Sequence, residues 1–149
     1  MLSKKSKYAI KALVVLAKEY ETHTPKRISE IAESEHIPRK FLEAILLELR
    51  NKGILGSKKG VSGGYYLLKK PSEIMLSDLI RITDGPIALL PCVSLNFYER
   101  CEECTDEITC GIRDVALEVR DASLRILNGT SLEDIVKREK KLARSAARK

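Results

Sequence analysis

The chain has 149 residues, and its 27 Lys and Arg against 21 Asp and Glu give a formal net charge of +6. This length suits one compact domain or a small domain with an extended appendage, and 44% hydrophobic residues is ordinary for a folded protein. The longest early apolar run, residues 12–17, is far too short for an export signal or a membrane span. We therefore expect a cytoplasmic protein without a membrane partner.

Positive charge is concentrated toward both ends of the chain. Residues 1–60 carry 13 Lys and Arg against 7 Asp and Glu, and residues 111–149 carry 10 against 6. Between them, residues 92–110 carry one Arg and five acidic residues. A basic N-terminal part suits a polyanion, because each Lys or Arg that contacts a phosphate releases condensed counterions. Excess lysine is more often solvated surface, so charge alone is a weak indication of nucleic acid binding.

Two helices joined by a tight turn are predicted, a short one that runs through Ser34 and a longer one over residues 38–51, after a first helix over residues 6–20. Ser29 is the expected N-cap of the shorter helix, and Pro38 suits the first turn of the longer one. The longer helix has a buried stripe of Leu42, Ile45, Leu46 and Leu49 and a solvent face of Arg39, Lys40, Glu43 and Arg50. In a helix-turn-helix, the start of the second helix contacts base edges in the major groove. An ordinary charged surface helix shows the same pattern, so the pair of helices alone does not establish a DNA-binding motif.

A glycine-rich segment with two lysines follows this pair. Residues 54–55 and 65–68 are expected to form short strands around a tip over residues 56–64. Glycine allows the tight backbone path of such a tip, and Lys58 and Lys59 place charge where a phosphate or a minor groove would lie. A nucleotide-binding phosphate loop is the competing interpretation, but its Gly-Lys-Ser/Thr ending before a helix is missing. The sequence therefore predicts a winged helix-turn-helix.

Three further helices are predicted after the wing. Ser77 is the expected N-cap of the first, residues 108–128 form the second, and Thr130 with Glu133 forms a capping box for the third. The second helix repeats apolar residues at alternating spacings of three and four: Ile112, Val115, Val119, Ala122 and Ile126. Such a seam packs lengthwise on another helix, which favours dimerisation over a place in a monomer core. Residues 139–149 have little apolar surface and are predicted to form a frayed or disordered tail.

All the cysteines lie within nineteen residues: Cys92, Cys101, Cys104 and Cys110. Cytoplasmic thiols are kept reduced, so this cluster argues for a metal centre or reactive thiols rather than structural disulfides. Four thiols satisfy an iron–sulfur cluster, while Cys101 and Cys104 also match half of a structural zinc site or a reversible disulfide switch. A thiol–disulfide enzyme would need this Cys-x2-Cys pair in a βαβ context, which the sequence lacks, so no enzyme is predicted.

Several segments together resemble one family. They are residues 7–13, 28–32, 37–43 and 59–65, followed by the cysteines, the long helix and the closing Gly-Thr-Ser-Leu-Glu-Asp-Ile. These features resemble the winged-helix transcription regulators typified by IscR, the iron–sulfur cluster regulator, with NsrR and RirA as relatives. The likeness covers residues 1 to about 138, and the wing segment is its most specific part.

The resemblance implies a homodimeric bacterial regulator, expected to be a repressor, that reads a pseudo-palindromic promoter site in double-stranded DNA. The helix over residues 38–51 and the wing would contact the DNA, and the helix over residues 111–128 would form the dimer. With the pattern of the residues themselves, the candidate DNA-binding positions are Tyr8, Ser29, Pro38, Arg39, Lys40, Phe41, Glu43, Lys58, Lys59, Gly60, Ser62 and Gly63. Glu43 is suited to accept a hydrogen bond from cytosine N4.

The resemblance also implies that an iron–sulfur cluster, expected to be 2Fe–2S, controls promoter binding in response to iron–sulfur, redox or nitric oxide status. Cys92, Cys104 and Cys110 match ligand positions of the family. Cys101 is an additional thiol that is available as the fourth ligand, because Arg113 stands where one branch of the family places histidine. The alternative is a cluster-free regulator that responds to a small molecule of cysteine metabolism or to thiol oxidation, or one that holds structural zinc.

The predicted fold class is mainly α, with a winged helix-turn-helix, a two-stranded wing and a long C-terminal dimerisation helix. Its expected parts are a DNA-binding domain, a cysteine-bearing sensor loop, a dimerisation helix with a closing helix, and a basic tail, over residues 1–86, 87–110, 111–138 and 139–149.

Overall fold

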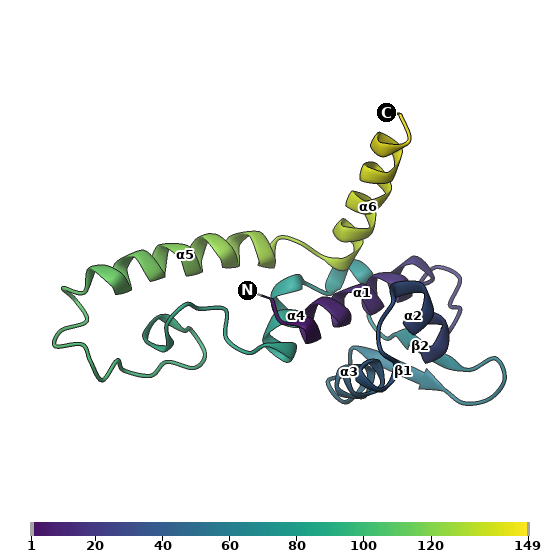
Figure 1. Ribbon diagram of the computed structural model, residues 1–149, viewed down its shortest axis with the longest axis horizontal. Helices are drawn as coiled ribbons and strands as arrows, with labels where there is room; N and C mark the ends of the chain where they lie inside the picture. Colours follow the sequence, from purple (N-terminus) through teal and green to yellow (C-terminus); the bar gives the residue numbers. More distant parts are fainter. Residues whose placement is uncertain (1, 149) are drawn as a thin grey trace.

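The computed structural model describes residues 2–148 and confirms a mostly helical winged-helix fold with a long helix beyond it. The helices are α1 (Lys4–Lys18), α2 (Ile28–Glu35), α3 (Arg39–Asn51), α4 (Leu76–Thr83), α5 (Gly111–Asn128) and α6 (Leu132–Ala146), with short 3-10 turns η1 (Pro71–Glu73) and η2 (Pro91–Val93). The strands are β1 (Leu55–Lys58) and β2 (Gly64–Leu67). In Figure 1, α1 to α4 and the strands form one body, α5 extends away from it, and α6 rises on the side opposite α3.

The hydrophobic core lies among α1, α2, α3, the strands and the beginning of α6. α3 buries the predicted stripe of Leu42, Ile45, Leu46 and Leu49. α1 contributes Ala9, Ala12, Leu13 and Leu16, which places its apolar face on the same core. Leu132 and Val136 belong to this core too, so the first turns of α6 are anchored on the winged-helix body.

The wing is tied to the segment that precedes α2. β1 and β2 are antiparallel, with Leu55 opposite Leu67 and Lys58 opposite Gly64. The amide of Tyr65 donates to the carbonyl of Lys26 at 2.8 Å, and the amide of Lys26 donates to the carbonyl of Tyr65 at 2.9 Å. A side chain at Gly64 would overlap the Lys26 carbonyl, so this close approach requires glycine. The base of the wing is therefore fixed to the helix-turn-helix.

The predicted N-caps of α2 and α4 are wrong. The N-cap of α2 lies two residues earlier than expected, because the Glu30 carboxylate accepts a hydrogen bond from the Arg27 amide at 2.6 Å and makes Arg27 the cap. Ser29 is consequently an exposed residue in the first turn. Ser77 is a buried residue inside α4, whose N-cap is Met75. A backbone bridge holds Met75 extended against Ser131, which sets the start of α4 there.

The capping box of α6 lies one residue from its predicted place. The Thr130 hydroxyl donates back to the Ile126 carbonyl of α5 at 2.8 Å and is not available as a cap. Ser131 is the N-cap instead: its hydroxyl accepts from the Asp134 amide at 3.2 Å, and its amide donates to the Asp134 carboxylate at 2.9 Å. The box therefore pairs Ser131 with Asp134 rather than Thr130 with Glu133.

Replacing Ser131 by alanine is expected to lower the free energy of unfolding by about 1 kcal/mol, the usual cost of losing a serine cap. Hydrogen bonds from the amide and hydroxyl of Ser131 hold the pKa of Asp134 below its ordinary value of 3.8. Because this pKa is depressed on folding, the contribution is complete above about pH 4 and is lost as the pH falls below that value. Urea denaturation at pH 7 and pH 3 measures both effects. An equal loss in S131A at the two pH values would contradict the coupling.

The predicted disordered tail is wrong for residues 139–146, which continue α6. Lys, Arg, Ala and Leu dominate this stretch, and these residues have high helix propensity. Glu133 and Lys137 form an i,i+4 ion pair at 2.8 Å, and Glu139 pairs with Lys18 of α1 at 2.7 Å. Basic residues near the end of the helix also complement its dipole. Residue 149 lies outside the described part of the chain.

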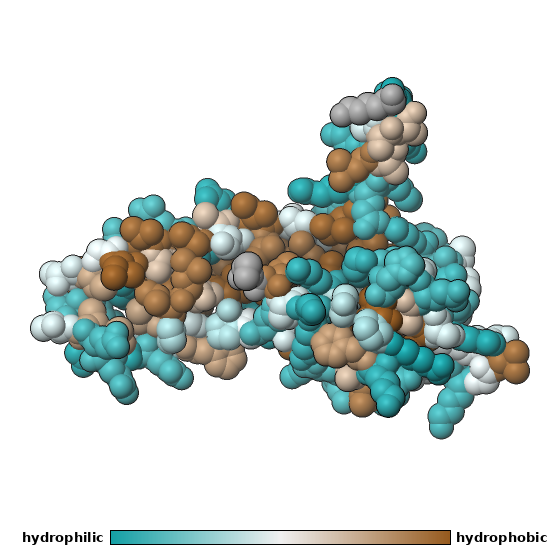
Figure 2. All heavy atoms as spheres, in the orientation of Figure 1, coloured by the Kyte–Doolittle hydropathy of each residue, from teal (hydrophilic) through white to brown (hydrophobic). Residues whose placement is uncertain are grey.

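α5 begins at Gly111, three residues later than predicted, and has a buried face and an exposed apolar face. Ala116 and Leu124 are buried against the rest of the chain. The predicted seam lies on another face and is solvent-exposed, with exposed fractions of 75% for Ile112, 60% for Val115 and 64% for Ile126. Figure 2 shows apolar side chains gathered over α5. In residues 2–148 no helix is long and apolar enough to cross a membrane.

Candidate DNA-binding surface and cysteine loop

The start of α3 presents polar side chains to solvent. Pro38 is the N-cap of α3 rather than a residue of its first turn, so the helix begins one residue later than predicted. Arg39, Lys40 and Glu43 are exposed in the first turns, as predicted from the helix periodicity. The guanidinium of Arg39 lies 3.2 Å from the Glu43 carboxylate, so the two side chains hold each other on this surface. An arginine and a carboxylate at the start of a helix are suited to guanine and to cytosine edges respectively. This pair gives α3 the chemistry for direct base contacts.

Two aromatic rings support the start of α3. Tyr8 of α1 and Phe41 of α3 pack edge to face, with ring centroids 5.7 Å apart and planes at 83°. Phe41 remains 42% exposed, which is unusual for a phenylalanine that packs only inward. Tyr8 is half-buried beneath the helix-turn-helix surface. The structure therefore brings these two candidate residues together, and their roles in DNA binding stay predictions.

The wing tip carries the candidate basic contacts. Lys58 and Lys59 are exposed, as is Ser62. Gly60 has φ of 104°, a conformation that residues with side chains rarely adopt. At Gly63 a side chain would overlap the carbonyl oxygen of Lys58, so the tip folds back on itself only with glycine there. The glycines shape the tip, and the lysines place positive charge on it.

Arg27 was not among the predicted site residues, yet it fixes the wing tip. Its guanidinium donates a hydrogen bond to the Val61 carbonyl, which joins the start of α2 to the loop between the strands. This links the wing to the helix-turn-helix, in addition to the bridge at Lys26. The arginine directly before the helix was visible in the sequence, but nothing local indicated a contact 34 residues away.

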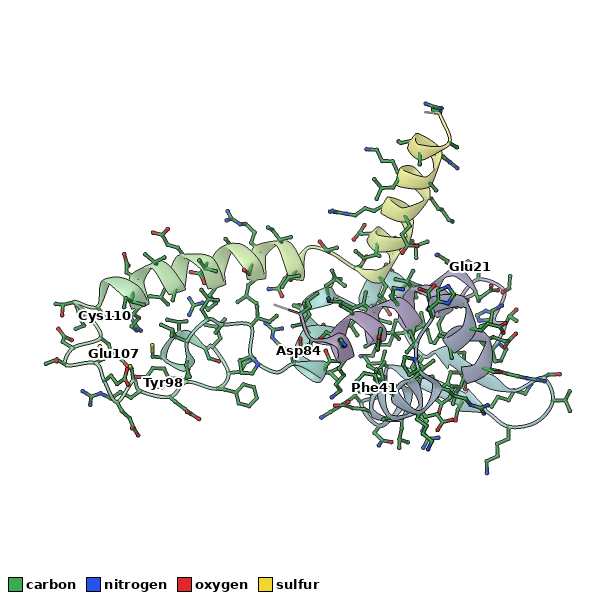
Figure 3. The ribbon with its side chains drawn as sticks, in the orientation of Figure 1. Glu21, Phe41, Asp84, Tyr98, Glu107 and Cys110 are labelled. Atoms are coloured by element: carbon green, nitrogen blue, oxygen red, sulfur yellow. The ribbon has the colours of Figure 1, made fainter. Side chains whose placement is uncertain are left out.

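The cysteines lie at the far end of the molecule from this surface. Figure 3 places Cys110 beside Glu107 and Tyr98, with Phe41 at the opposite end. Cys92 is buried in a small apolar cluster with Val93 and Ala116, and Cys101 packs against this cluster. All four cysteines are free thiols. The loop thus has a small core of its own beneath α5.

An arginine of α5 holds the segment around Cys92. The guanidinium of Arg120 donates to the Val93 carbonyl at 2.7 Å and pairs with Asp121 at 2.7 Å. The Arg120 side chain is largely buried, so it is a fixed link rather than a solvated charge. Sequence periodicity could not separate Arg120 from the other arginines of α5, and it was missed.

The thiols of Cys104 and Cys110 influence each other's pKa. The thiol of Cys104 donates to the Asp106 carbonyl at 3.2 Å. A hydrogen bond from the Arg113 amide, with smaller help from Cys104 and Ile112, lowers the pKa of Cys110, the N-cap of α5. Burial and the neighbouring Cys110 raise the pKa of Cys104. Cys110 is therefore the thiol of this pair that ionises first, which suits a metal ligand or a redox-active group.

The donor set fits a thiolate-bound metal group in type and number. It offers four free thiols, and the buried Nε of Arg113 beside Cys110 has no hydrogen-bond partner, so a donor is available for an anionic sulfur. The Arg113 Nε is 3.8 Å from Glu107, an ion-pair distance but too long for a hydrogen bond. No three ligand side chains converge as a metal site among residues 2–148. The thiols are near one another without being arranged as a finished site.

A winged helix with an exposed basic reading surface and a long exposed apolar helix defines a DNA-binding transcription regulator. Residues 2–138 match the family profile described as "Rrf2: Iron-dependent Transcriptional regulator". The chain is 46% identical over 138 residues to an rrf2-like HTH-type transcriptional regulator of Rhodobacter capsulatus, covering 91% of this chain and 92% of that protein. It belongs to the Rrf2 family of transcriptional regulators, which are not enzymes.

Solved structures agree with this assignment. CymR, the global cysteine regulator of Bacillus subtilis, superposes with a TM-score of 0.76 at 29% identity, over 92% of this chain and 96% of that one. T. potens IscR superposes with a TM-score of 0.73 at 24% identity, over 93% and 88% of the two chains. At 24% identity, the comparison with IscR shows a shared fold alone.

Proposed function

We propose that this transcription regulator is a bacterial homodimer, paired along α5, that acts in the cytoplasm as a repressor at a pseudo-palindromic promoter site. The observation that carries its DNA contact is the exposed start of α3 together with the basic wing tip that Arg27 ties to the same body. α3 would read base edges in the major groove, while Lys58 and Lys59 contact phosphate or the minor groove.

Replacing Lys59 by alanine tests this surface. We expect affinity to fall by a similar factor for operator and unrelated duplexes, because phosphate contacts carry no sequence information. The slope of log affinity against log salt should decrease by about 0.9 for one lost phosphate contact. Fluorescence anisotropy over a salt series measures both quantities. Lys52 is also exposed and lies just past the end of α3, so Lys52→Ala should leave the slope unchanged. An unchanged slope in K59A would remove Lys59 from the interface.

The proposed sensor is an iron–sulfur group held by the cysteine loop. The four free thiols, the unpartnered Nε of Arg113 and the iron-dependent character of the matching family profile support it. When bound, such a group supplies a connection between loop and helix that iron supply or oxidation can break. The loop must rearrange to bring the thiols together. Cys110 is the N-cap of α5, and Arg120 joins α5 to the segment of Cys92, so that rearrangement would also shift α5.

A cluster-free regulator is the second candidate. It is favoured by the likeness to CymR, the global cysteine regulator of Bacillus subtilis, and by thiols that do not converge among the described residues. In this case a small molecule or oxidation of the thiols would be the signal. Structural zinc on the same cysteines is a third outcome, which differs in being colourless and redox-silent.

Anaerobic purification followed by absorption spectroscopy and iron and zinc assays distinguishes these candidates. The iron–sulfur proposal predicts a reddish-brown protein whose Cys104→Ala variant lacks iron and binds the promoter with altered affinity or footprint. A colourless native protein with stoichiometric zinc would replace it with the zinc candidate. An iron-free C104A protein that matches the cluster-loaded protein in affinity and footprint would contradict control by the cluster.

A further inference from the structure

A stripe of positive charge runs from the middle of α6 to just past its end. Its members recur every three, four or one residues, which places those in the helix on one side at about 100° per residue. They are Lys137, Lys140, Lys141 and Arg144 of α6 and Arg148, two residues past its end, and all are exposed. Of these five residues, only Lys137 has an ion-pair partner among residues 2–148, namely Glu133. Like charges at such spacings repel one another, so the stripe favours an anionic partner.

The surroundings of this basic stripe narrow the choice of partner. Leu142 is the one large apolar residue among residues 139–148, so insertion into a lipid surface is not favoured. α6 also projects on the side opposite α3 (Figure 1), so the stripe does not extend the DNA-reading surface of its own subunit. The partner is therefore expected to be an anionic surface that can contact the side of the molecule from which α6 projects.

The chain itself contains such a surface. Glu99, Glu102 and Glu103 in the cysteine loop are exposed and form no ion pair with any described residue. This acidic segment lies against the first turns of α5, because the neighbouring Cys101 packs with Ala116, whereas the basic stripe lies beyond the last residue of α5. The 12 residues that follow Ala116 up to Asn128 hold the two segments apart by at least about 18 Å at 1.5 Å per residue. They cannot meet within one subunit.

The exposed face of α5 indicates how two subunits bring them together. Its apolar residues are distributed around Val119, near the middle of the helix, so antiparallel pairing places Ile112 against the partner's Ile126. The winged-helix body lies at the end of α5 that leads into α6 (Figure 1). Antiparallel pairing thus separates the two reading heads by roughly the helix length, comparable to the half-site spacing of about 34 Å. Parallel pairing would bring the heads together.

We propose that the basic stripe of α6 docks the acidic segment of the cysteine loop of a second copy of the chain. This rests on the proposed α5 dimer, in which the start of one α5 lies beside the end of the other. α6 shares the core of α1 through Val136, and Glu139 pairs with Lys18. The contact therefore links the cysteine loop of one subunit to the DNA-reading head of its partner.

A reciprocal charge reversal tests the contact. One full-length variant carries K140E and K141E, a second carries E102K and E103K, and a third carries all four changes. Sedimentation at low salt should show dimer dissociation constants raised about tenfold in each of the first two, as expected for a few exposed ion pairs. The third should return to within about threefold of the native value. All differences should vanish near 1 M salt, where screening acts over about 3 Å.

The outcomes separate this contact from the proposed dimer. A native protein that sediments as a monomer would overturn both. A native dimer in which the two reversals are additive, without rescue, overturns the contact and leaves the dimer intact. A loss of DNA affinity in K140E/K141E with no change in dimerisation assigns the stripe to nucleic acid and likewise overturns the contact. Rescue in the fourfold variant cannot arise from misfolding, so it supports the contact directly.

Discussion

Replacing Val119 by aspartate is expected to convert the dimer to monomers and to lower operator affinity by at least about 100-fold, the usual scale of avidity between linked sites. Val119 lies near the middle of the exposed apolar face of α5 and is 40% exposed in the single chain. In an antiparallel pair it would face the partner's Val119, so the variant would bury two carboxylates against each other without a partner cation. Sedimentation gives the oligomeric state, and anisotropy gives the affinity.

The matched control places the same charge outside this face. Asn128 is exposed at the end of α5 on its polar side, so Asn128→Asp should leave both the dimer and the operator affinity within about twofold of native. Val119 is not part of the buried clusters of the single chain, so both variants should keep their helices. Circular dichroism checks this. A V119D protein that remains dimeric with native operator affinity would exclude α5 as the dimer helix.

The apolar face of α5 was predicted correctly because its residues recur in the sequence at helical spacings. Spacings of three and four identified Ile112, Val115 and Val119 as a stripe, and the structure shows that stripe unburied. The same periodicity explains the success with α3 and the wing, where apolar stripes and glycines report local geometry. Caps were less predictable. Whether Ser29 or Arg27 caps α2 depends on which side chain bonds the backbone, and the Glu30 carboxylate, which accepts from the Arg27 amide, moves the cap by two residues.

Contacts between segments that are far apart in the chain could not be predicted from the sequence. Arg27 reaches the wing tip and Arg120 reaches the carbonyl next to Cys92, and both look like ordinary surface arginines in the sequence. α6 shows the converse error. Low apolar content suggested disorder, but helix propensity and the pair between Lys18 and Glu139 keep the helix continuous to Ala146. The contacts of Arg27, Arg120 and Glu139 all depend on which segments lie side by side in the folded chain, and local composition does not determine that.

Replacing Gly63 by alanine is expected to lower DNA affinity by about tenfold or more, the scale of losing one or two specific contacts, while the helical body stays folded. An added methyl group would overlap the Lys58 carbonyl and approach the Gly60 carbonyl, and both are backbone atoms that a rotamer change cannot move. The tip must therefore open. Opening it pulls Lys59 away from its position and strains the Arg27 hydrogen bond to Val61. Anisotropy measures the affinity, and circular dichroism with urea denaturation measures the fold.

Val61→Ala is the matched control for Gly63→Ala because it changes the same tip without changing the backbone path. Val61 is 86% exposed, and its carbonyl, which accepts the Arg27 hydrogen bond, is retained. We expect native affinity in V61A and a large loss in G63A. Equal losses would mean that side-chain volume at the tip contacts DNA. A G63A protein with native affinity would show that the wing makes no contribution, and that α3 alone carries recognition by each head.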